Sequence, residues 1–279
     1  MNKNLNLKSV LITGCSSGIG YELVVSFLKK GYRVFATARK KSDLDILTGL
    51  GASAIHCELT DSVSIRTCID FLHTQVSSLD FLINNAAYAQ PAAVLDLSSS
   101  DMSAQFQVNV FGTLELTRLL LPLLEMSVSP RIFFLSSILG VLTVPYLGAY
   151  CASKQALESF ASALRMELLN KKVKVIMIRP GKIATPFHKT ALAKFDHSID
   201  KFNSLYAHGY SEYLQKRANT SHDSQKGLHP RAVVKVIERV MFIKNPRIAY
   251  YVTWQAKLLG RMRCFFTQGL LERLIARFS

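Results

Sequence analysis

The 279-residue chain lacks several features that would place it in a specialised class of protein. Its cysteines are scattered, and no two have CxxC spacing: Cys15, Cys57, Cys68, Cys151 and Cys264. An odd, dispersed set of this kind indicates free thiols in a reducing compartment and argues against a disulfide framework or a zinc site. The seven histidines are equally dispersed, so we predict no metal site.

Long apolar runs and a leader segment are also missing. No uncharged apolar run reaches about 18 residues, the length that crosses a membrane, because Glu115 and Arg118 interrupt the run at 114–124. The polar residues 1–8 pass directly into a predicted strand and leave no room for a signal peptide. We therefore expect a cytoplasmic protein.

Acidic residues are scarce, since 19 Asp and Glu stand against 34 Lys and Arg, for a formal net charge of +15. The excess is strongest after His229, where Glu238 and Glu272 are the only acids. We find no nucleic-acid-binding module and expect no nucleic-acid partner. The basic amphipathic segment 253–279 suits either peripheral contact with an anionic membrane or packing in the core or in an oligomer.

Short apolar runs alternate with helical patterns along most of the chain. Six runs, each ending in small or polar residues, have the composition of buried parallel strands: 9–13, 33–37, 54–57, 81–83, 131–135 and 173–178. A further strand is expected at 247–252. The pattern predicts an α/β fold, a doubly wound parallel sheet of the Rossmann type with helices on both faces. Ligands of such sheets bind beyond the carboxyl ends of the strands.

We expect one domain over residues 1–279, because α/β folds often reach this length as a single unit. Residues 186–228 break the alternation and are rich in Lys, His, Tyr and Ser. An insert at this point would lie over the ligand edge as a lid or substrate wall. Residues 253–279 would then be a C-terminal helical extension.

A glycine-rich turn, Thr13-Gly14-Cys15-Ser16-Ser17-Gly18-Ile19-Gly20, joins the first strand to the first helix. Glycines allow the backbone to approach a pyrophosphate, and the helix N-terminus offers unpaired N–H groups to it. The spacing is G-x-x-x-G-x-G rather than the common G-x-G-x-x-G. After the second strand, Arg39 and Lys40 stand where an acid would select NAD, so we predict NADP(H) over NAD(H). A solvated basic loop is the alternative.

Tyr150 and Lys154 begin an amphipathic helix, four residues apart and so on the same face. A nearby ammonium favours the phenolate and lowers the pKa of a tyrosine toward the working range. The pair could therefore exchange a proton with a substrate. Asn109, inside the apolar pattern of a helix predicted at 103–124, is either a satisfied core amide or a functional one.

Together these signals carry a resemblance. Over about residues 8–190 the sequence resembles the short-chain dehydrogenases/reductases, in their motif order and spacing: Thr13-Gly14-x-x-x-Gly18-x-Gly20, Asn84-Asn85-Ala86-Ala87, Asn109, Ser137, Tyr150-x-x-x-Lys154 and Pro180-Gly181 with Thr185. The resemblance implies that Tyr150 is the acid in reduction and the base in oxidation, and that Lys154 tunes it and binds the nicotinamide ribose. Ser137, in preference to Ser136, would hold the substrate oxygen, and Asn109 would kink its helix and link Lys154 to a water relay.

The same resemblance implies the cofactor contacts. Asn85 would line the adenine-side ribose, and Ile183 and Thr185 would bind the carboxamide. The complete expected set is Gly14, Ser16, Ser17, Gly18, Ile19, Gly20, Arg39, Lys40, Glu58, Leu59, Asn85, Ala86, Tyr150, Lys154, Pro180, Gly181, Ile183 and Thr185. One departure is Glu58, because the family usually has an aspartate there that bonds the adenine amino group.

These expectations describe an NADP(H)-dependent oxidoreductase that transfers a hydride between nicotinamide and a carbonyl or secondary alcohol. The glycine turn, the Ala38-Arg39 pair and the basic tail look most like the branch acting on steroids, retinoids and acylglycerone phosphates, so a lipophilic substrate is expected. A homo-oligomer is expected as well. The alternative is a non-catalytic NADP-binding sensor or scaffold, which would not need Ser137, Tyr150 and Lys154.

Overall fold

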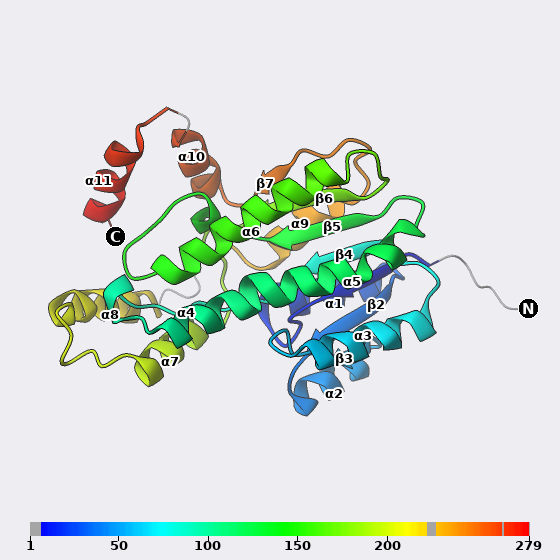
Figure 1. The fold of residues 1–279 in the computed structure, drawn as a ribbon, viewed down its shortest axis with the longest axis horizontal. Helices are drawn as coiled ribbons and strands as arrows, with labels where there is room; N and C mark the ends of the chain where they lie inside the picture. Colours follow the sequence, from blue (N-terminus) through cyan, green and yellow to red (C-terminus); the bar gives the residue numbers. More distant parts are fainter. Residues whose placement is uncertain (1–6, 222–226, 264, 279) are drawn as a thin grey trace, which may run out of the picture.

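A seven-stranded, wholly parallel sheet organises the chain (Figure 1). The computed structural model describes residues 7–221, 227–263 and 265–278. The strand order is β3-β2-β1-β4-β5-β6-β7. The strands are β1 (Ser9–Ile12), β2 (Arg33–Ala38), β3 (Ser53–His56), β4 (Phe81–Asn84), β5 (Arg131–Leu135), β6 (Lys174–Arg179) and β7 (Ala249–Tyr251). This confirms the predicted doubly wound α/β fold.

The order of the strands reverses direction between β1 and β4. From β1 the chain builds outward through β2 to β3 and then returns to place β4 on the other side of β1. Ile12 is in register with Ala36 on one side and with Ile83 on the other. The turns that follow β1, β2 and β4 therefore emerge at one edge, at the reversal point where such sheets bind ligands.

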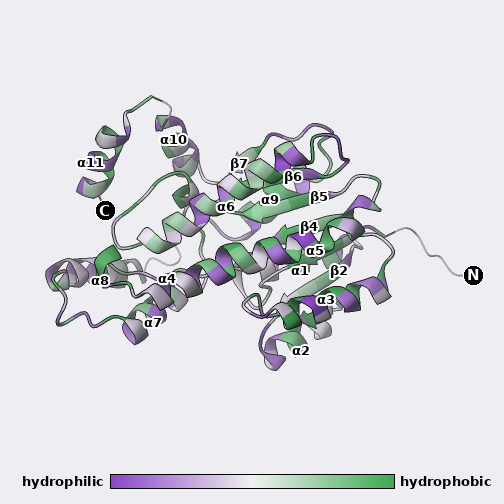
Figure 2. Ribbon diagram, in the orientation of Figure 1, coloured by the Kyte–Doolittle hydropathy of each residue, from purple (hydrophilic) through white to green (hydrophobic). Residues whose placement is uncertain are grey.

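Helices cover both faces of the sheet. The buried side chains of α1, α2 and α9 form one core with the first face, and those of α3, α5 and α6 form a second core with the other. Figure 2 shows hydrophobic strands between helices of mixed polarity. The helices are α1 (Gly18–Lys29), α2 (Lys41–Gly49), α3 (Ser62–Gln75), α4 (Ser99–Phe106), α5 (Thr113–Glu125), α6 (Gly148–Glu167), α7 (Phe187–Ser198), α8 (Ala207–Ser221), α9 (Arg231–Val240), α10 (Trp254–Met262) and α11 (Gln268–Phe278).

The helix predicted at 103–124 is longer and is not regular. A π-helical segment, η2 (Gln107–Gly112), joins α4 to α5 and contains Asn109. Gly112 allows this segment to approach the chain after β3, because a Cβ there would lie 1.9 Å from the Leu59 carbonyl oxygen. Segments of π-helix are rare and often occur at functional sites. The helix is therefore irregular at Asn109.

The segment predicted as an insert folds as α7 and α8, while residues 222–226 lie outside the described part. Its two ends meet at the sheet, since Ile183 forms an isolated bridge with Leu228. The Ala184 N–H donates to the Leu228 carbonyl at 3.0 Å. Tyr210 of α8 fastens the insert to the loop before α4, because its hydroxyl bonds Asp96 and accepts the Ala93 N–H at 2.9 Å.

Two elements differ from the sequence analysis. Helix α2 was not identified, although the Lys41–Asp45 ion pair along its first turns supports it. The C-terminal helical extension, which the sequence analysis did not divide, consists of two helices, α10 and α11, with Phe265, Phe266 and Thr267 between them. Aromatic and β-branched side chains have low helix propensity, which explains the break.

Candidate active site

Hydrogen bonds across the reversal point hold the glycine turn against the first residues after β4. The Thr13 hydroxyl oxygen accepts the N–H groups of Asn85 and Ala86, both at 3.0 Å. In return the Asn85 side-chain amide donates to the carbonyls of Thr13 at 2.8 Å and Gly14 at 3.0 Å. These four bonds hold the turn in one shape, and they place Asn85 and Ala86 beside it.

Three glycines of the turn are required by this geometry. Gly14 and Gly18 have left-handed backbones, with φ of 69° and 60°. A Cβ on Gly20 would lie 2.3 Å from the Gly14 carbonyl oxygen and 2.7 Å from the Asn85 side-chain nitrogen. A Cβ on Gly18 would lie 3.0 Å from the Thr185 methyl. Thr185, one of the expected cofactor-binding residues that follow β6, therefore lies against this turn.

The N-terminus of α1 is suited to an anion. No acid lies in its first turn, and among the described residues no side chain caps it, although Ser17 occupies the N-cap position. The first N–H groups of a helix have no partner within the helix and carry a partial positive charge. Ser16 and Ser17 are exposed beside them. The turn therefore fits the pyrophosphate of a dinucleotide.

Arg39 and Lys40 are both exposed directly after β2. Arg39 forms an ion pair with Glu58 at 3.3 Å, and the other Glu58 oxygen accepts the Thr60 N–H at 3.2 Å. The longer side chain of glutamate thus reaches across to Arg39. The carboxylate expected to contact adenine is bound to the arginine expected to contact the 2′-phosphate.

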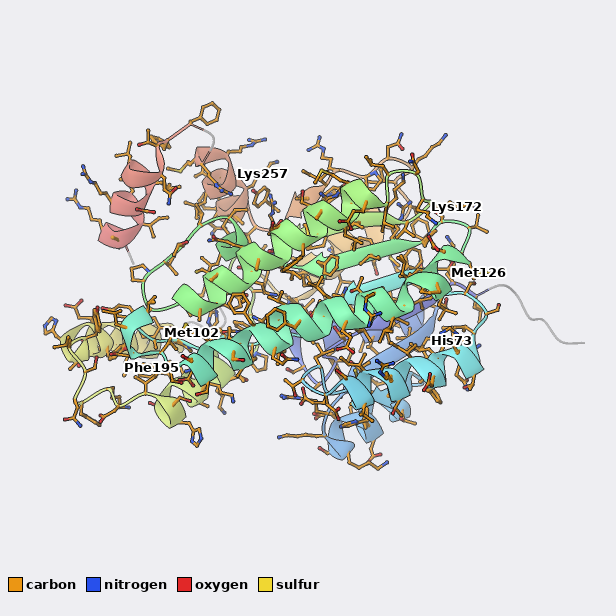
Figure 3. The ribbon with its side chains drawn as sticks, viewed as in Figure 1. His73, Met102, Met126, Lys172, Phe195 and Lys257 are labelled. Atoms are coloured by element: carbon orange, nitrogen blue, oxygen red, sulfur yellow. The ribbon has the colours of Figure 1, made fainter. Side chains whose placement is uncertain are left out.

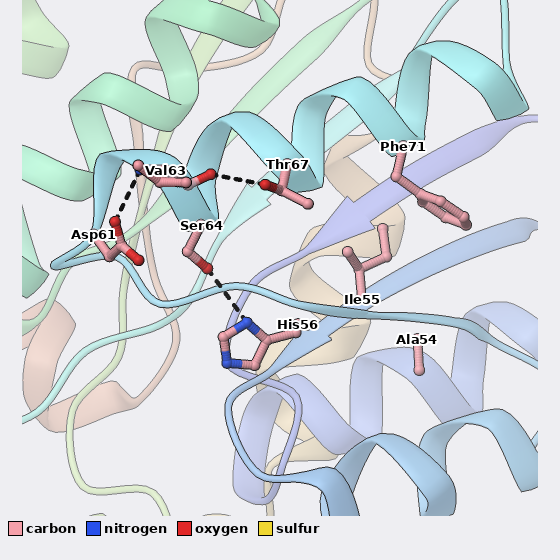
Figure 4. Close-up of a pocket in the computed structure, with 8 residues that line it drawn as sticks. All are labelled: Ala54, Ile55, His56, Asp61, Val63, Ser64, Thr67 and Phe71. Carbon is pink, nitrogen blue, oxygen red and sulfur yellow. Dashed lines mark hydrogen bonds between the residues drawn. The ribbon is translucent and has the colours of Figure 1, made fainter.

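A groove of about 410 Å³ lies between the edge strand β3 and α3 (Figure 4). In it His56 Nδ1 is 3.3 Å from the Ser64 hydroxyl, which accepts the Glu58 N–H at 2.9 Å. The groove holds none of the expected catalytic residues, so we do not assign it as the substrate site. Its side chains instead fix the backbone at Glu58.

Tyr150 and Lys154 lie on the first two turns of α6, as their spacing predicts, and both are buried. Burial raises the pKa of the Tyr150 phenol, and a hydrogen bond with the Ser137 side chain opposes this rise. Ser137 is therefore the serine beside the phenol. The Ser136 hydroxyl is buried facing Gly140, where an added Cβ would lie 2.4 Å away, and no described group bonds it.

Lys154 donates from its Nζ to the Leu135 carbonyl at 2.7 Å, at the end of β5. Burial lowers the pKa of this ammonium to about 8, and the negative charge of Glu158 opposes the fall. The Nζ lies 5.9 Å from the centroid of the Tyr150 ring. Burial is the largest cause of the pKa shift at both groups, and it disfavours the charged form of each.

Asn109 has a fully bonded side chain. Its oxygen accepts the Tyr88 N–H at 3.1 Å, and its nitrogen donates to the Tyr88 carbonyl and the Ser153 hydroxyl, both at 3.0 Å. Ser153 in turn donates to the Tyr150 carbonyl at 2.8 Å. Asn109 therefore reaches α6 through Ser153, one residue before Lys154.

The turn after β6 lies at the same carboxyl edge of the sheet. The Ile138 N–H donates to the Pro180 carbonyl at 2.9 Å, which joins the loop after Ser137 to the Pro180-Gly181 turn. Ile183 is buried and Thr185 lies against Gly18. Every residue of the expected set thus lies at the carboxyl edge of the sheet or in the segments that extend from it.

Two further residues were missed in the sequence. Arg179, the last residue of β6, makes a bidentate pair with Glu158 of α6 at 2.8 and 2.9 Å and donates to the Tyr251 hydroxyl at 2.9 Å. Glu158 lies one helical turn after Lys154. The pattern Tyr-x-x-x-Lys-x-x-x-Glu on one helix, followed by Arg at a strand end, was the available signal.

Apolar side chains cover Tyr150. The ring of Phe187, the first residue of α7, lies 5.6 Å from the Tyr150 ring. Leu139, Val144, Leu147 and Ala191 join the same buried cluster. The surroundings of the phenol are apolar, and one side of them belongs to the insert.

The sequence analysis also predicted free cysteines, no metal site and no membrane-crossing run. Cys15, Cys57, Cys68 and Cys151 are free and buried, whereas Cys264 lies outside the described residues. Within the described ranges, no three or more His, Cys, Asp and Glu side chains gather as metal ligands would. None of the helices described has both the length and the apolarity to cross a membrane.

Comparison with known proteins decides the family. Residues 8–195 match the family model described as short chain dehydrogenase. The chain belongs to this family. It is 33% identical over 259 residues to the uncharacterized oxidoreductase YbbO of Escherichia coli (strain K12), covering 91% of this chain and 90% of that protein. It is therefore an oxidoreductase of the short-chain type.

Two relatives have more specific names. The 3-ketodihydrosphingosine reductase of Bacteroides thetaiotaomicron is 28% identical over 85% of this chain and 84% of its own length. The NADPH-dependent 3-dehydrocapnine reductase of Ornithobacterium rhinotracheale is 35% identical over 64% and 66%. Among solved structures, a short-chain dehydrogenase from Streptomyces avermitilis matches with a TM-score of 0.77 and 25% identity, over 95% of this chain and 94% of its own.

The bonds of Thr13 give a test of the turn. Thr13→Val keeps the shape of the side chain but leaves the Asn85 and Ala86 N–H groups without their acceptor. An unsatisfied buried donor costs about 1–3 kcal/mol, so we expect a loss of about 2–4 kcal/mol in the free energy of unfolding, measured with urea. Thr67→Val on the exposed face of α3 is the matched control and should change it by less than about 1 kcal/mol. Equal effects of the two variants would contradict the assignment.

Proposed function

We propose that the protein is an NADP(H)-dependent reductase of a carbonyl group, or dehydrogenase of the matching secondary alcohol, on an apolar substrate. The observation that carries the proposal is the meeting of two sites at one sheet edge. A glycine turn suited to a pyrophosphate contacts Thr185, and the loop after Ser137 is bonded to the Pro180-Gly181 turn of the same segment. Tyr150 and Lys154 are buried on α6, and Lys154 bonds Leu135 at the end of β5, a strand that lies between β1 and β6 in the sheet.

The residues present fit the dinucleotide. The free N–H groups at the start of α1 would bind the pyrophosphate, and Asn85 and Ala86 would line the adenine-side ribose. Pro180, Gly181, Ile183 and Thr185 would hold the carboxamide end, while Lys154 and Tyr150 would bind the nearby ribose. Leu59, against the π-helical segment, would border the adenine. The relative whose name states NADPH dependence supports the choice of this cofactor.

When bound, NADPH supplies a hydride to the carbonyl carbon. Ser137 donates a hydrogen bond to the substrate oxygen and Tyr150 gives that oxygen a proton as negative charge develops on it. The apolar surroundings keep the phenol protonated and able to donate. The Lys154 ammonium then stabilises the phenolate that remains, because the two groups lie on one face of α6. In oxidation the same groups act in reverse.

An apolar substrate follows from the walls of the site. The cluster around Tyr150 consists of aliphatic and aromatic side chains from the loop before α6 and from α7. Burying apolar surface of a substrate there is favourable by about 25 cal/mol per Å². The name of the Bacteroides relative specifies a keto substrate, which agrees with this reading. Segment 186–228 would form a lid over the site or one wall of it, since the centroids of the Phe187 and Tyr150 rings lie 5.6 Å apart.

A homo-oligomer is proposed through α5 and α6. A groove of about 540 Å³ lies between these helices, lined by Phe111, Leu121, Phe160 and Leu164 among others. Phe111 and Phe160 are each nearly half exposed. A second copy would cover these aromatic rings by presenting the same face, as a two-fold interface requires.

The reductase activity can be tested directly. NADPH oxidation is measured against a panel of long-chain ketones, steroids, retinoids and quinones, with NADH alongside. We expect turnover of an apolar carbonyl that Tyr150→Phe lowers by at least 100-fold while NADPH still binds, because the proton donor is gone. Full activity of Tyr150→Phe would contradict the mechanism. NADPH binding without turnover of any substrate would favour a sensor or scaffold.

The charge of Lys154 predicts a pH dependence. Its pKa is lowered to about 8, so the ammonium is lost as pH rises through about 8 and kcat/KM for reduction should fall there. Glu158→Gln removes the charge that raises this pKa, and the fall should begin at lower pH. Glu167→Gln, exposed on the same helix, is the control and should leave the profile in place. A profile unchanged by Glu158→Gln would contradict the role of Lys154.

The Arg39–Glu58 pair predicts the choice of cofactor. Arg39→Ala should weaken NADPH binding about tenfold or more, since an ionic hydrogen bond contributes about 1.5–3 kcal/mol, and leave NADH binding unchanged. Glu58→Gln should have a smaller effect of the same kind, because it releases Arg39 from its position. Lys41→Ala, whose partner is Asp45, is the control. Binding is measured by calorimetry, and equal losses for both cofactors would contradict the assignment.

A further inference from the structure

The C-terminal helix pair, α10 and α11 with residues 265–267 between them, exposes large apolar side chains that a folded core would hide. Trp254 is 70% exposed, Leu258 51% and Phe265 85%. Phe266 and Leu270 are also exposed. Single exposed apolar residues are common on soluble proteins, but a group of this size on adjacent helices marks a contact surface.

Cations lie among these apolar residues. The exposed cations of the pair are Lys257, Arg261, Arg263, Arg273 and Arg277, against one acid, Glu272. Glu272 already accepts a hydrogen bond from Gln268 at 2.8 Å. No ion pair joins any of the five cations to an acid in the part of the chain that the structure describes. An apolar surface with unpaired positive charge is complementary to a layer of anionic headgroups above acyl chains.

The pair is attached at the active-site edge of the sheet. α10 begins after Thr253, whose hydroxyl caps it and lies where a Cβ on Gly181 would come within 2.2 Å. α10 also contacts η3 (Ile138–Gly140), the turn that follows Ser137. Figure 1 shows α8, α10 and α11 at the end of the molecule opposite the start of β1.

The lid presents further apolar side chains at this end. In the connection between α7 and α8, Phe202 is 83% exposed and Leu205 is 96% exposed. Leu95, in the turn that Tyr210 of α8 fastens through Asp96, is 79% exposed. The lid and the C-terminal helix pair thus add apolar surface on two sides of the edge where Tyr150 lies.

We propose that the C-terminal helix pair and the α7–α8 connection dock the protein on the surface of an anionic lipid bilayer, with the active-site edge facing the membrane. Trp254, Leu258 and Phe265 enter the headgroup boundary, and the cations bind lipid phosphates. An apolar substrate then enters the site from the bilayer, and this step rests on the proposed function. Docking itself does not rest on it.

A second copy of the chain fits this surface less well. Two copies meeting here by two-fold symmetry would bring the same cations of both pairs together, and like charges facing each other oppose association. The α5–α6 face has acids as well as cations along its groove, including Glu115, Arg118 and Glu167, and so has no such conflict.

The single tryptophan makes the docking measurable. Trp254 is the only one in the chain, so tryptophan emission, excited selectively over that of the ten tyrosines, reports this surface alone. With the full-length protein we expect a blue shift on vesicles of phosphatidylcholine with 30% phosphatidylglycerol, and quenching when the acyl chains carry bromine. Vesicles of phosphatidylcholine alone should bind at least tenfold more weakly, because each basic residue near an anionic surface contributes about 1 kcal/mol. Raising the salt concentration should also weaken binding.

Matched charge reversals locate the surface. Lys257→Glu with Arg261→Glu should weaken binding to the anionic vesicles by at least tenfold. Lys172→Glu with Lys174→Glu, exposed at the other edge of the sheet, should not (Figure 3 labels Lys172 and Lys257). Equal effects of the two pairs, or equal binding to neutral and anionic vesicles, would overturn the proposal. A blue shift that grows with protein concentration in the absence of lipid would also overturn it, because the surface would then join copies of the chain.

Activity separates this proposal from the proposed function. The Lys257/Arg261 reversal should keep kcat and KM for a short, water-soluble ketone and raise KM for a long-chain ketone presented in anionic vesicles. Vesicle binding without turnover of any carbonyl would remove the proposed function and leave docking standing. Turnover of the soluble ketone without vesicle binding would do the reverse.

Discussion

The side-chain and backbone bonds between Thr13 and Asn85-Ala86 are the constraint on which the site depends. They cross the point where the strand order reverses, so they fix the glycine turn of one half of the sheet against the loop of the other. Gly20 can approach Gly14 and Asn85 as closely as it does because it has no Cβ. The anion site at α1 and the path of the segment at Thr185 both follow from the shape of this turn.

The proposed catalytic residues are placed rigidly, in an environment that disfavours their charged forms. α6 carries Tyr150, Lys154 and Glu158 on successive turns, so their separations are set by the pitch of one helix. Burial disfavours the charged form of both Tyr150 and Lys154. The hydrogen bond with Ser137 opposes this effect at Tyr150, and the charge of Glu158 opposes it at Lys154. Arg179 holds Glu158 in place from β6. The proton chemistry proposed for the site would thus draw on two neighbouring strands and one helix.

Much of the fold was predictable because buried parallel strands leave a strong local signal. The run Arg131–Leu135 was placed to the residue, and the predicted strands at 9–13 and 33–37 differ from the observed ones by one residue. The glycine turn and the Tyr150–Lys154 spacing were also readable, since each depends on residues close in sequence. The break between α10 and α11 was missed, because their apolar periodicity is nearly continuous.

What the sequence could not supply was contact between distant segments. The Arg179–Glu158 pair and the Arg39–Glu58 pair each join residues about twenty positions apart, through geometry that only the folded sheet defines. The same holds for Asn109, whose bonds to Ser153 and to the Tyr88 backbone join segments far apart in the sequence. Burial is the largest cause of the pKa shift at Tyr150, and solvent exclusion cannot be read from spacing.

The bridge between Ile183 and Leu228 has a consequence for how this chain could diversify. The two ends of the segment between them are joined at one place, beyond the end of β6. Joining the ends of a longer loop adds little entropy cost, because that cost grows only with the logarithm of loop length. Ser137, Tyr150 and Lys154, the residues proposed for proton transfer, lie outside this segment, and Thr185 precedes α7 within it. A different wall could therefore replace α7 and α8 in one exchange, giving the same chemistry a new substrate without disturbing the sheet beneath.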